Sequence, residues 1–242
     1  MEMTNRAAAM KSDRTGSPGR AQTLTDRAEA LLQSEIISGR LQPEERLVLP
    51  SLEKRLGIGL TPLREALSRL VAHGLVTVEG NKGFRVSTIS MGDLVDITKT
   101  RVIVECGALR LSMENREEEW EEGLVGATHR LVKAVGQLQG PISENLEKYD
   151  AAHRNFHRAL LAGCGVPRLM SLQGDLYDQA YRYRRLMAEG GMNPQRVIEE
   201  HRLLSDLALG TDIEAACQAL ARHLALTLEA VFPDTPLPED GK

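Results

Sequence analysis

Four of the six histidines stand where their imidazoles could share one metal ion. His153 and His157 are four residues apart, so they lie on the same face of any helix that contains both. His201 follows a helix start by two turns, and His223 stands midway along the last long helical segment. Imidazoles that converge from several helices form metal sites in the cores of helical bundles. On spacing alone, however, solvated or core histidines are the more common explanation of such a pair.

The histidines do not form the motif of a zinc hydrolase. Arg154 follows His153, so the His-Glu-x-x-His pattern, whose glutamate acts as general base, is missing. A metalloenzyme built on the histidines remains a less favoured alternative, and we expect a protein that is not an enzyme. His73 and His129 fit no metal pattern and are expected at the surface.

A second set of residues, nearer the N-terminus, has the chemistry for contacting DNA. Arg64 lies one turn into a predicted helix, where its guanidinium can reach a guanine or a phosphate. The segment 81–83 is a compact, cationic turn that suits a minor groove or a phosphate backbone. The candidate DNA-binding residues are Thr61, Arg64, Arg69, Asn81, Lys82 and Gly83.

The elements that position these DNA-contacting residues follow from apolar periodicity and from glycine and proline. Helices are predicted over 25–37, 51–56 and 61–73, and 46–49 is a short extended segment. Strands over 75–78 and 84–86 flank a turn at 80–83, which predicts a β-hairpin. Two short helices, a tight turn and a hairpin form the plan of a winged helix-turn-helix. The alternative is a small helical domain whose charges are merely solvated.

The chain after residue 88 is predicted to be helical as far as Phe232. Breaks are expected at 140–141, 163–165, 190–191 and 210, and Asn193-Pro194 is a strong helix start. The fold class is therefore mainly α: an N-terminal winged helix-turn-helix with a small β-hairpin wing, then an all-helical antiparallel bundle. The predicted domains are a disordered arm over 1–22, the DNA-binding domain over 23–88, a helical effector-binding and dimerisation domain over 89–232, and a disordered tail over 233–242.

Charge and cysteine content support two modules in a reducing compartment. The net charge is −4, but residues 1–88 carry a net +3 and residues 89–242 a net −7, so the first part is better suited to meet phosphate. The three cysteines form no Cys-x-x-Cys pair, and we expect single buried thiols. No secretory signal and no apolar run of about 20 residues is present, so a cytoplasmic protein without a membrane span is expected.

Residues 36–88 closely resemble the DNA-binding domain of the GntR family of regulators. The resemblance rests on the run Thr61-Pro62-Leu63-Arg64-Glu65-Ala66-Leu67, together with Ile37-x-Gly39-x-Leu41-x-Pro43, Leu56-Gly57-Ile58, Gly74-Leu75-Val76 and Gly83-Phe84-x-Val86. The helical second part resembles the FadR-like branch, whose FCD domain senses a ligand. In the family, Ser/Thr-Arg commonly precedes Thr-Pro, and this arginine reads bases. Gly59-Leu60 stands there instead, so a different operator sequence is expected.

The resemblance also implies a ligand set for a metal ion. FCD domains of the metal-binding type have an aspartate four residues before the histidine of a Phe-His pair, and then two later histidines. Phe156-His157, His201 and His223 match that pattern, but His153 stands at the aspartate position, and Asp150, one turn earlier, is an alternative fourth ligand. Four imidazoles suit Zn²⁺ or Ni²⁺ better than Mg²⁺ or Ca²⁺, which prefer oxygen.

A metal ion with open coordination positions can bind a carboxylate, and arginines could hold a second one. Arg101 begins an Arg-x3-Glu105 pattern that resembles the first sensing helix of the family, and Arg182 and Arg184 flank Tyr183 in a later helix. Segments such as Ala162-Gly163-Cys164-Gly165 look similar to members of the branch that repress glutarate utilisation. We therefore expect a dicarboxylate effector such as glutarate, while surface ion pairs are the alternative for each arginine.

The sequence thus predicts a homodimeric transcriptional regulator, a repressor, that binds a near-palindromic double-stranded operator. A small carboxylate bound at a metal ion in the helical domain is expected to shift the dimer away from its DNA-binding geometry. The main alternative within the same fold is a regulator with a metal-free pocket for an apolar acyl ligand.

Overall fold

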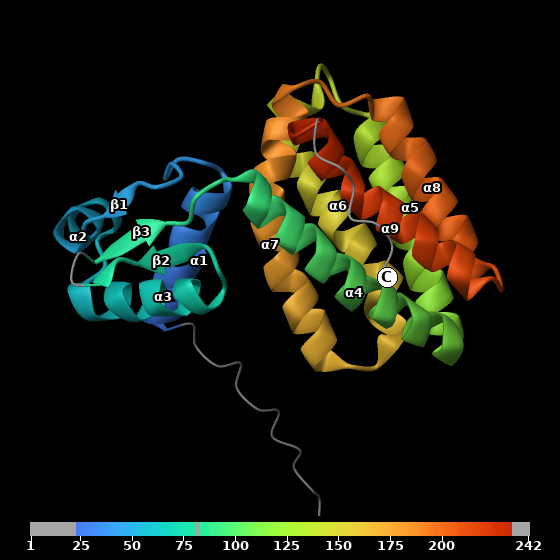
Figure 1. The fold of residues 1–242 in the computed structure, drawn as a ribbon, viewed down its shortest axis with the longest axis horizontal. Coiled ribbons are helices and arrows are strands. Elements are labelled where there is room, and N and C mark those ends of the chain that lie inside the picture. The colour runs from blue at the N-terminus through green and yellow to red at the C-terminus, as the bar shows by residue number, and fades with distance from the viewer. Residues whose placement is uncertain (1–22, 81–82, 234–242) are drawn as a thin grey trace, which may run out of the picture.

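The structure is a computed structural model that describes residues 23–80 and 83–233. These residues form a small N-terminal unit and a larger helical bundle, which lie side by side (Figure 1). The predicted disordered arm over 1–22, Asn81 and Lys82 of the wing, and residues 234–242 of the predicted tail lie outside the described residues. The mainly α fold class is confirmed.

The N-terminal unit contains three helices and a three-stranded antiparallel sheet. The helices are α1 (Leu24–Ile37), α2 (Leu49–Leu56) and α3 (Leu60–Ala72), and the strands are β1 (Arg46–Leu47), β2 (Val76–Val78) and β3 (Phe84–Val86). The sheet order is β1-β3-β2, with Arg85 opposite both Arg46 and Thr77. The expected two-stranded wing is present, and the extended segment at 46–47 adds a third strand to it.

Local sequence explains how these helices begin and end. Thr23 and Asp26 form a reciprocal capping box at the start of α1, with bonds of 3.0 and 3.1 Å. Gly57 has φ 64°, a left-handed conformation that ends α2 and turns the chain into α3. Leu32 of α1 and Leu63 and Leu67 of α3 are fully buried, so α1 holds α3 through an apolar core.

The second unit is a bundle of six long helices in the described residues. They are α4 (Met91–Asn115), α5 (Glu118–Gly136), α6 (Leu146–Leu161), α7 (Pro167–Glu189), α8 (Pro194–Leu209) and α9 (Ile213–Val231), with short 3₁₀ turns at Ile142–Asn145 and Ala162–Cys164. All the breaks expected at glycine and proline are present. The Asn193 side chain caps α8 by accepting from the amides of Gln195 (2.9 Å) and Arg196 (3.3 Å).

One break in the bundle was not expected from the sequence. α4 ends and α5 begins around Arg116, which has a positive φ of 34° although it is not glycine. Its guanidinium donates to the carbonyl oxygens of Leu209 and Gly210 at the end of α8 and pairs with Glu121. These tertiary bonds stabilise a turn that carries no glycine or proline signal.

The cysteines correct a second expectation, because two of them lie against each other. Cys106 of α4 contacts the carbonyl oxygen of Cys217 at 3.4 Å, and the Cys217 sulfur contacts the carbonyl oxygen of Cys106 at 3.6 Å. The two positions are 111 residues apart in the sequence, so no local pattern could reveal the pair. Cys164 is a buried thiol, as expected.

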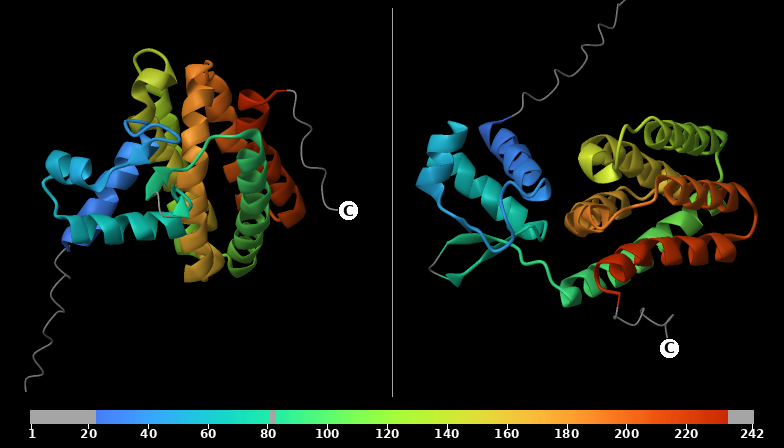
Figure 2. Two further views of the ribbon diagram at one scale, coloured as in Figure 1. Left: turned by 60° about the vertical axis from the view of Figure 1, so that its left-hand side comes forward. Right: turned by 90° about the horizontal axis from the view of Figure 1, so that it is seen from above.

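The two units contact each other mainly through α7, which lies on the side of the bundle nearest the N-terminal unit (Figure 2). The Gln33 amide of α1 donates to Asp178 at 2.6 Å, and the Gln179 amide donates to the carbonyl oxygen of His73 at 2.8 Å. The His73 ring also lies 2.8 Å from Asp175. His73, which was expected to be a surface residue, is therefore half-buried in the interface, whereas His129 is exposed as expected.

No helix within the described ranges combines the length and the apolarity that crossing a membrane requires.

Candidate metal centre and DNA-reading surface

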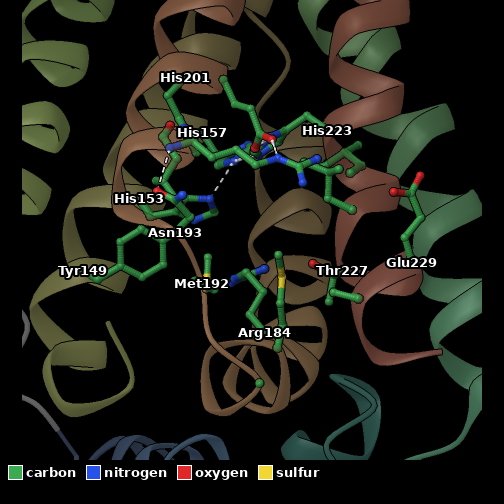
Figure 3. A pocket seen from close by; sticks show the side chains of 18 of the residues that line it. Tyr149, His153, His157, Arg184, Met192, Asn193, His201, His223, Thr227 and Glu229 are labelled. Atoms are coloured by element: carbon green, nitrogen blue, oxygen red, sulfur yellow. Dashed lines mark hydrogen bonds and ion pairs between the residues drawn. The ribbon is translucent and has the colours of Figure 1, made fainter. Parts of the chain in front are cut away.

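Four imidazoles meet inside the bundle. His153 and His157 come from α6, His201 from α8 and His223 from α9 (Figure 3). One ring nitrogen from each histidine lies within 4.8 Å of the other three. The Nε2 atom of His157 is 3.3 Å from Nε2 of His153 and 3.2 Å from Nε2 of His223. The four predicted histidines therefore lie together. The first two share a face of α6, and α8 and α9 supply one each.

The outer nitrogens of two rings fix which nitrogen faces the cluster. Nδ1 of His201 lies 2.7 Å from the carbonyl oxygen of Val197, an acceptor only, so Nδ1 must carry the proton. Burial raises the pKa of Tyr177, so its hydroxyl keeps its proton and donates to Asp150 at 2.8 Å. The same hydroxyl therefore accepts from Nδ1 of His153 at 2.7 Å. In both rings the Nε2 lone pair is left to point into the cluster.

Carboxylates face the outer nitrogens of the other two rings. Nδ1 of His157 lies 3.6 Å from Glu105, and Nδ1 of His223 lies 3.7 Å from Glu200. Burial alone would raise the pKa of Glu105, but the Arg101 guanidinium and then His157 outweigh this effect and lower the pKa to about 2. Oxygen partners on the outer nitrogens are the usual arrangement behind metal-binding histidines, because they orient the ring and raise its basicity.

The cluster has the donor properties of a transition-metal site. Burial lowers the pKa of His157 to about 3, so its imidazole is neutral at pH 7, the form that binds a metal ion. His201 Nε2 is buried and has no hydrogen-bond partner among the described residues. The two Nε2 separations of 3.2 and 3.3 Å are short enough for one ion with metal–nitrogen bonds of about 2.0–2.1 Å to reach these nitrogens together. The residues therefore fit Zn²⁺ or Ni²⁺.

Asp150, the alternative fourth ligand, does not lie within this group of nitrogens. Its Oδ1 accepts from the Tyr177 hydroxyl at 2.8 Å and from Arg184 at 3.3 Å. The structure thus brings His153 into the cluster and places Asp150 behind it, as a partner of the residue that orients His153.

A cavity of about 400 Å³ adjoins the histidines. Arg101 of α4 and Arg184 of α7 line it, and Figure 3 shows Arg184 across the open space from His201 and His223. Arg101 is 4% exposed, and its Nη2 has no hydrogen-bond partner within residues 23–80 and 83–233. Arg184 is also 4% exposed, and its Nε and Nη1 lack partners in the same ranges. Unpaired N–H groups on buried guanidiniums are costly, so the cavity is suited to an anion.

The expectation that Arg182 lines the same cavity is wrong. Its guanidinium donates to the carbonyl oxygens of Ser87 and Thr88, in the segment that joins the two units. Arg182 and Arg184 are two residues apart, and such residues do not share a helix face. Arg182 therefore holds the joining segment against α7.

The candidate DNA-reading surface includes the exposed start of α3. Thr61 and Arg64 are exposed there, beside Leu60, and Gly83 is exposed at the wing with φ 93°. Arg69, another candidate DNA-binding residue, forms ion pairs with Asp26 (3.0 Å) and Glu29 (3.1 Å) of α1 and with Glu65 (3.0 Å). This guanidinium fixes α3 to α1, and its contact with DNA stays a prediction.

Sequence reasoning missed the residues behind the histidines. Glu105 was noticed only as part of the Arg101 pattern, although its carboxylate faces His157. Tyr177 and Glu200 were not predicted. Glu200 is adjacent to His201 in the sequence, but this is a weak signal because its carboxylate faces His223 of another helix. Tyr177 carries no sequence signal, because its partner His153 lies 24 residues away.

Comparison with known families identifies the class of protein. Residues 24–86 match the model of the bacterial regulatory proteins of the gntR family, and residues 96–226 match the FCD domain. The chain belongs to the GntR family of transcriptional regulators and carries an FCD domain.

Relatives of known name agree with this assignment. The chain is 35% identical to the HTH-type transcriptional regulator BphR of Paraburkholderia xenovorans (strain LB400), over 83% of this chain and 82% of that protein. It is 34% identical to the HTH-type transcriptional repressor GlaR of Escherichia coli (strain K12), over 80% and 89%. Among solved structures, E. coli McbR/YncC aligns with a TM-score of 0.71 and 25% identity, covering 87% of this chain and 98% of that one.

Proposed function

We propose that this regulator is a repressor whose operator binding is controlled by a small dicarboxylate, such as glutarate, held at a metal ion in the FCD domain. The observation that carries the proposal is one cavity bordered by four inward-facing imidazoles and by two buried arginines with unpaired N–H groups. A metal ion and a guanidinium both bind carboxylates strongly.

His153, His157, His201 and His223 would hold the metal ion, Zn²⁺ or Ni²⁺ by the softness of the donors. The metal ion would supply a Lewis-acidic anchor for one carboxylate. Glu105, Tyr177, Glu200 and the Val197 carbonyl oxygen orient the four rings, so the ligand set is prepared before the metal arrives.

Arg101 and Arg184 would bind the second carboxylate. The cavity wall also includes Met187, Met192 and Leu224, whose apolar side chains suit a short methylene chain. A metal-free acyl ligand is the alternative, but it would leave both guanidiniums with unpaired buried N–H groups, each of which costs about 1–3 kcal/mol. The relatives named above are transcriptional regulators by name, which favours a binding function over a metalloenzyme.

On the DNA side, Thr61 and Arg64 at the start of α3 would contact base edges, while the wing contacts the backbone. One recognition helix reads only half of a near-palindromic operator, so we infer a cytoplasmic homodimer with one half-site per chain.

The test uses an operator selected from random-sequence DNA by the full-length protein. Its affinity is measured by fluorescence anisotropy for metal-free protein, for Zn²⁺-loaded protein, and for Zn²⁺-loaded protein with glutarate or with pentanoate as the matched monocarboxylate. Glutarate should weaken operator binding by the usual coupling of about 5- to 150-fold, and pentanoate should act more weakly. An operator affinity that neither Zn²⁺ nor any carboxylate changes would contradict the proposed regulation.

A further inference from the structure

We propose that six side chains, from His153 through Tyr177, Asp150, Arg154 and Asp178 to Gln33, form a polar relay that couples the metal centre to the DNA-binding unit. The relay deepens the proposed function and rests on it. It assigns a coupling role to residues that contact neither the metal ion, apart from His153 itself, nor DNA.

The relay begins at the metal centre. His153 presents Nε2 to the cluster and donates from Nδ1 to Tyr177 at 2.7 Å, and Tyr177 donates to Asp150 at 2.8 Å. His153 and Tyr177 are buried and Asp150 is 9% exposed, so little water competes for these bonds. A metal ion bound at Nε2 would make Nδ1–H a stronger donor. This would strengthen the hydrogen bond from His153 to Tyr177 and alter the one from Tyr177 to Asp150.

The effector cavity reaches the same carboxylate by a second route. Arg184 lines the cavity and donates to Asp150 Oδ1 at 3.3 Å, while its Nε and Nη1 have no partner in the described part of the chain. An anion in the cavity would attract this guanidinium and weaken its hold on Asp150. The hydrogen bonds of Asp150 therefore depend on the metal ion, through Tyr177, and on the effector, through Arg184.

Arg154 carries the relay from Asp150 towards the other unit. Its Nε lies 3.9 Å from Asp150 Oδ2, and its Nη2 donates to Asp178 Oδ1. The same guanidinium lies 4.5 Å from the centre of the Tyr177 ring, and that of Arg184 lies 4.1 Å from it. A guanidinium shared between two carboxylates responds to any change in the charge that one of them presents.

The last step crosses between the units. Asp178 is 7% exposed and uses its second oxygen, Oδ2, to accept from the Gln33 amide of α1 at 2.6 Å. α1 is fixed to the recognition helix α3 by their shared core and by the ion pairs of Arg69 with Asp26 and Glu29. A change in the hold of Asp178 on α1 is therefore transmitted to the helix that reads DNA.

Gln33→Met tests the relay, because it keeps the length of the side chain but cannot donate to Asp178. Gln179→Met is a matched control: this glutamine also joins α7 to the N-terminal unit, through the carbonyl oxygen of His73 at 2.8 Å, but has no bond to the relay. Operator affinity is measured for full-length wild type and both variants, without metal, with Zn²⁺ alone, and with Zn²⁺ and glutarate.

In wild type, Zn²⁺ or glutarate should change operator affinity by about 5- to 150-fold. In Gln33→Met this ratio should fall towards unity while Zn²⁺ content stays the same, and in Gln179→Met the wild-type ratio should remain. Asp178→Asn, which weakens the hold of Arg154, should behave like Gln33→Met. Equal ratios in all four proteins, or an equal loss in the Gln179 control, would overturn the relay and leave the proposed function standing. A wild type that responds to neither Zn²⁺ nor glutarate would overturn both.

Discussion

Arg64 is the exposed cation one turn into α3, where a major-groove helix presents its side chains to base edges. Arg64→Ala should weaken specific operator binding by about 1–3 kcal/mol without changing the fold. Arg130→Ala, at an exposed position in α5, is the matched control and should leave operator affinity unchanged. Gel-shift titrations at one fixed salt concentration compare the three proteins. A wild-type affinity in Arg64→Ala would remove this residue from the reading surface.

Arg101 pairs with Glu105 and also lines the cavity. A useful substitution must keep the pairing with Glu105 and change only the side that faces the cavity. The Arg101 Nε donates to Glu105 at 2.7 Å, and removing all charge would leave that carboxylate buried and unpaired. Arg101→Lys keeps a cation beside Glu105 but loses the planar fork and with it Nη2.

We expect Arg101→Lys to retain its Zn²⁺ and to lose about 1.5–3 kcal/mol of glutarate binding, which is roughly ten- to a hundredfold in affinity. Pentanoate binding should change little, because that ligand has only the metal-bound carboxylate. Calorimetry with both acids measures the difference. If wild type bound the two acids equally, the second anchor would not exist, and a metal-free apolar ligand would become the better hypothesis.

At the scale of elements, the turn after α6 packs tightly against α4, so a larger residue in this turn should change the stability of the protein. A Cβ added at Gly163 would lie 3.0 Å from Trp120 and 3.2 Å from the Ser112 backbone. Gly163→Ala should therefore destabilise the protein by about 1–3 kcal/mol, the usual cost of overpacking. Gly174→Ala, inside α7, where no described atom outside the neighbouring helix backbone lies within 4 Å of the added Cβ, should instead stabilise it by about 0.5–1 kcal/mol.

Urea unfolding of metal-free wild type and of both alanine variants measures these changes. A neutral Gly163→Ala would show that the packing around the turn differs from that described, and a destabilised Gly174→Ala would show that the space beside this position of α7 is not open.

The elements that the sequence predicted well are those whose ends are marked by local chemistry. Gly57 ends α2, Asn193 caps α8, and the i,i+4 spacing of His153 and His157 places both rings on one face of α6. The α4–α5 turn was missed because Arg116 is stabilised there by the end of α8 rather than by its own conformational preference.

Contacts between distant parts of the chain could not be predicted. Asp178 meets Gln33 across 145 residues, and Cys106 meets Cys217 across 111, with no periodic pattern that links them. Arg182 and Arg184 are two residues apart, so helix geometry alone could have predicted that they do not line the same cavity. Local spacing and the family resemblance thus predicted the four histidines of the cluster, but not the residues that orient them.

For the molecule as a whole, the buried histidines predict acid sensitivity of the metal-free protein. Burial lowers the pKa of His157 to about 3, whereas a histidine in the unfolded chain titrates near its ordinary pKa of about 6.5. Between these values the unfolded state binds more protons, so the unfolding free energy falls as pH falls from about 6.5 towards about 3. Burial also lowers the pKa of His153 and His201, which adds to the effect in the same direction.

Urea unfolding of metal-free protein at pH values from about 7.5 to 5.5 tests this, in a range above the titration of ordinary carboxylates. The stability of wild type should decline across the range, and that of His157→Gln should decline less, because its amide does not titrate. Parallel curves for the two proteins would mean that His157 is not held neutral by burial.

The most direct test of the central claim is the metal content of full-length, untagged protein purified without chelator. Elemental analysis of wild type should find about one Zn or Ni per chain, because four imidazole nitrogens lie close enough together to hold one transition-metal ion. His157→Ala, which removes the nitrogen lying 3.2–3.3 Å from two other Nε2 atoms, should contain far less, and His129→Ala as much as wild type. Wild-type protein without a stoichiometric metal ion, which also fails to take up Zn²⁺ in a titration, would contradict the account.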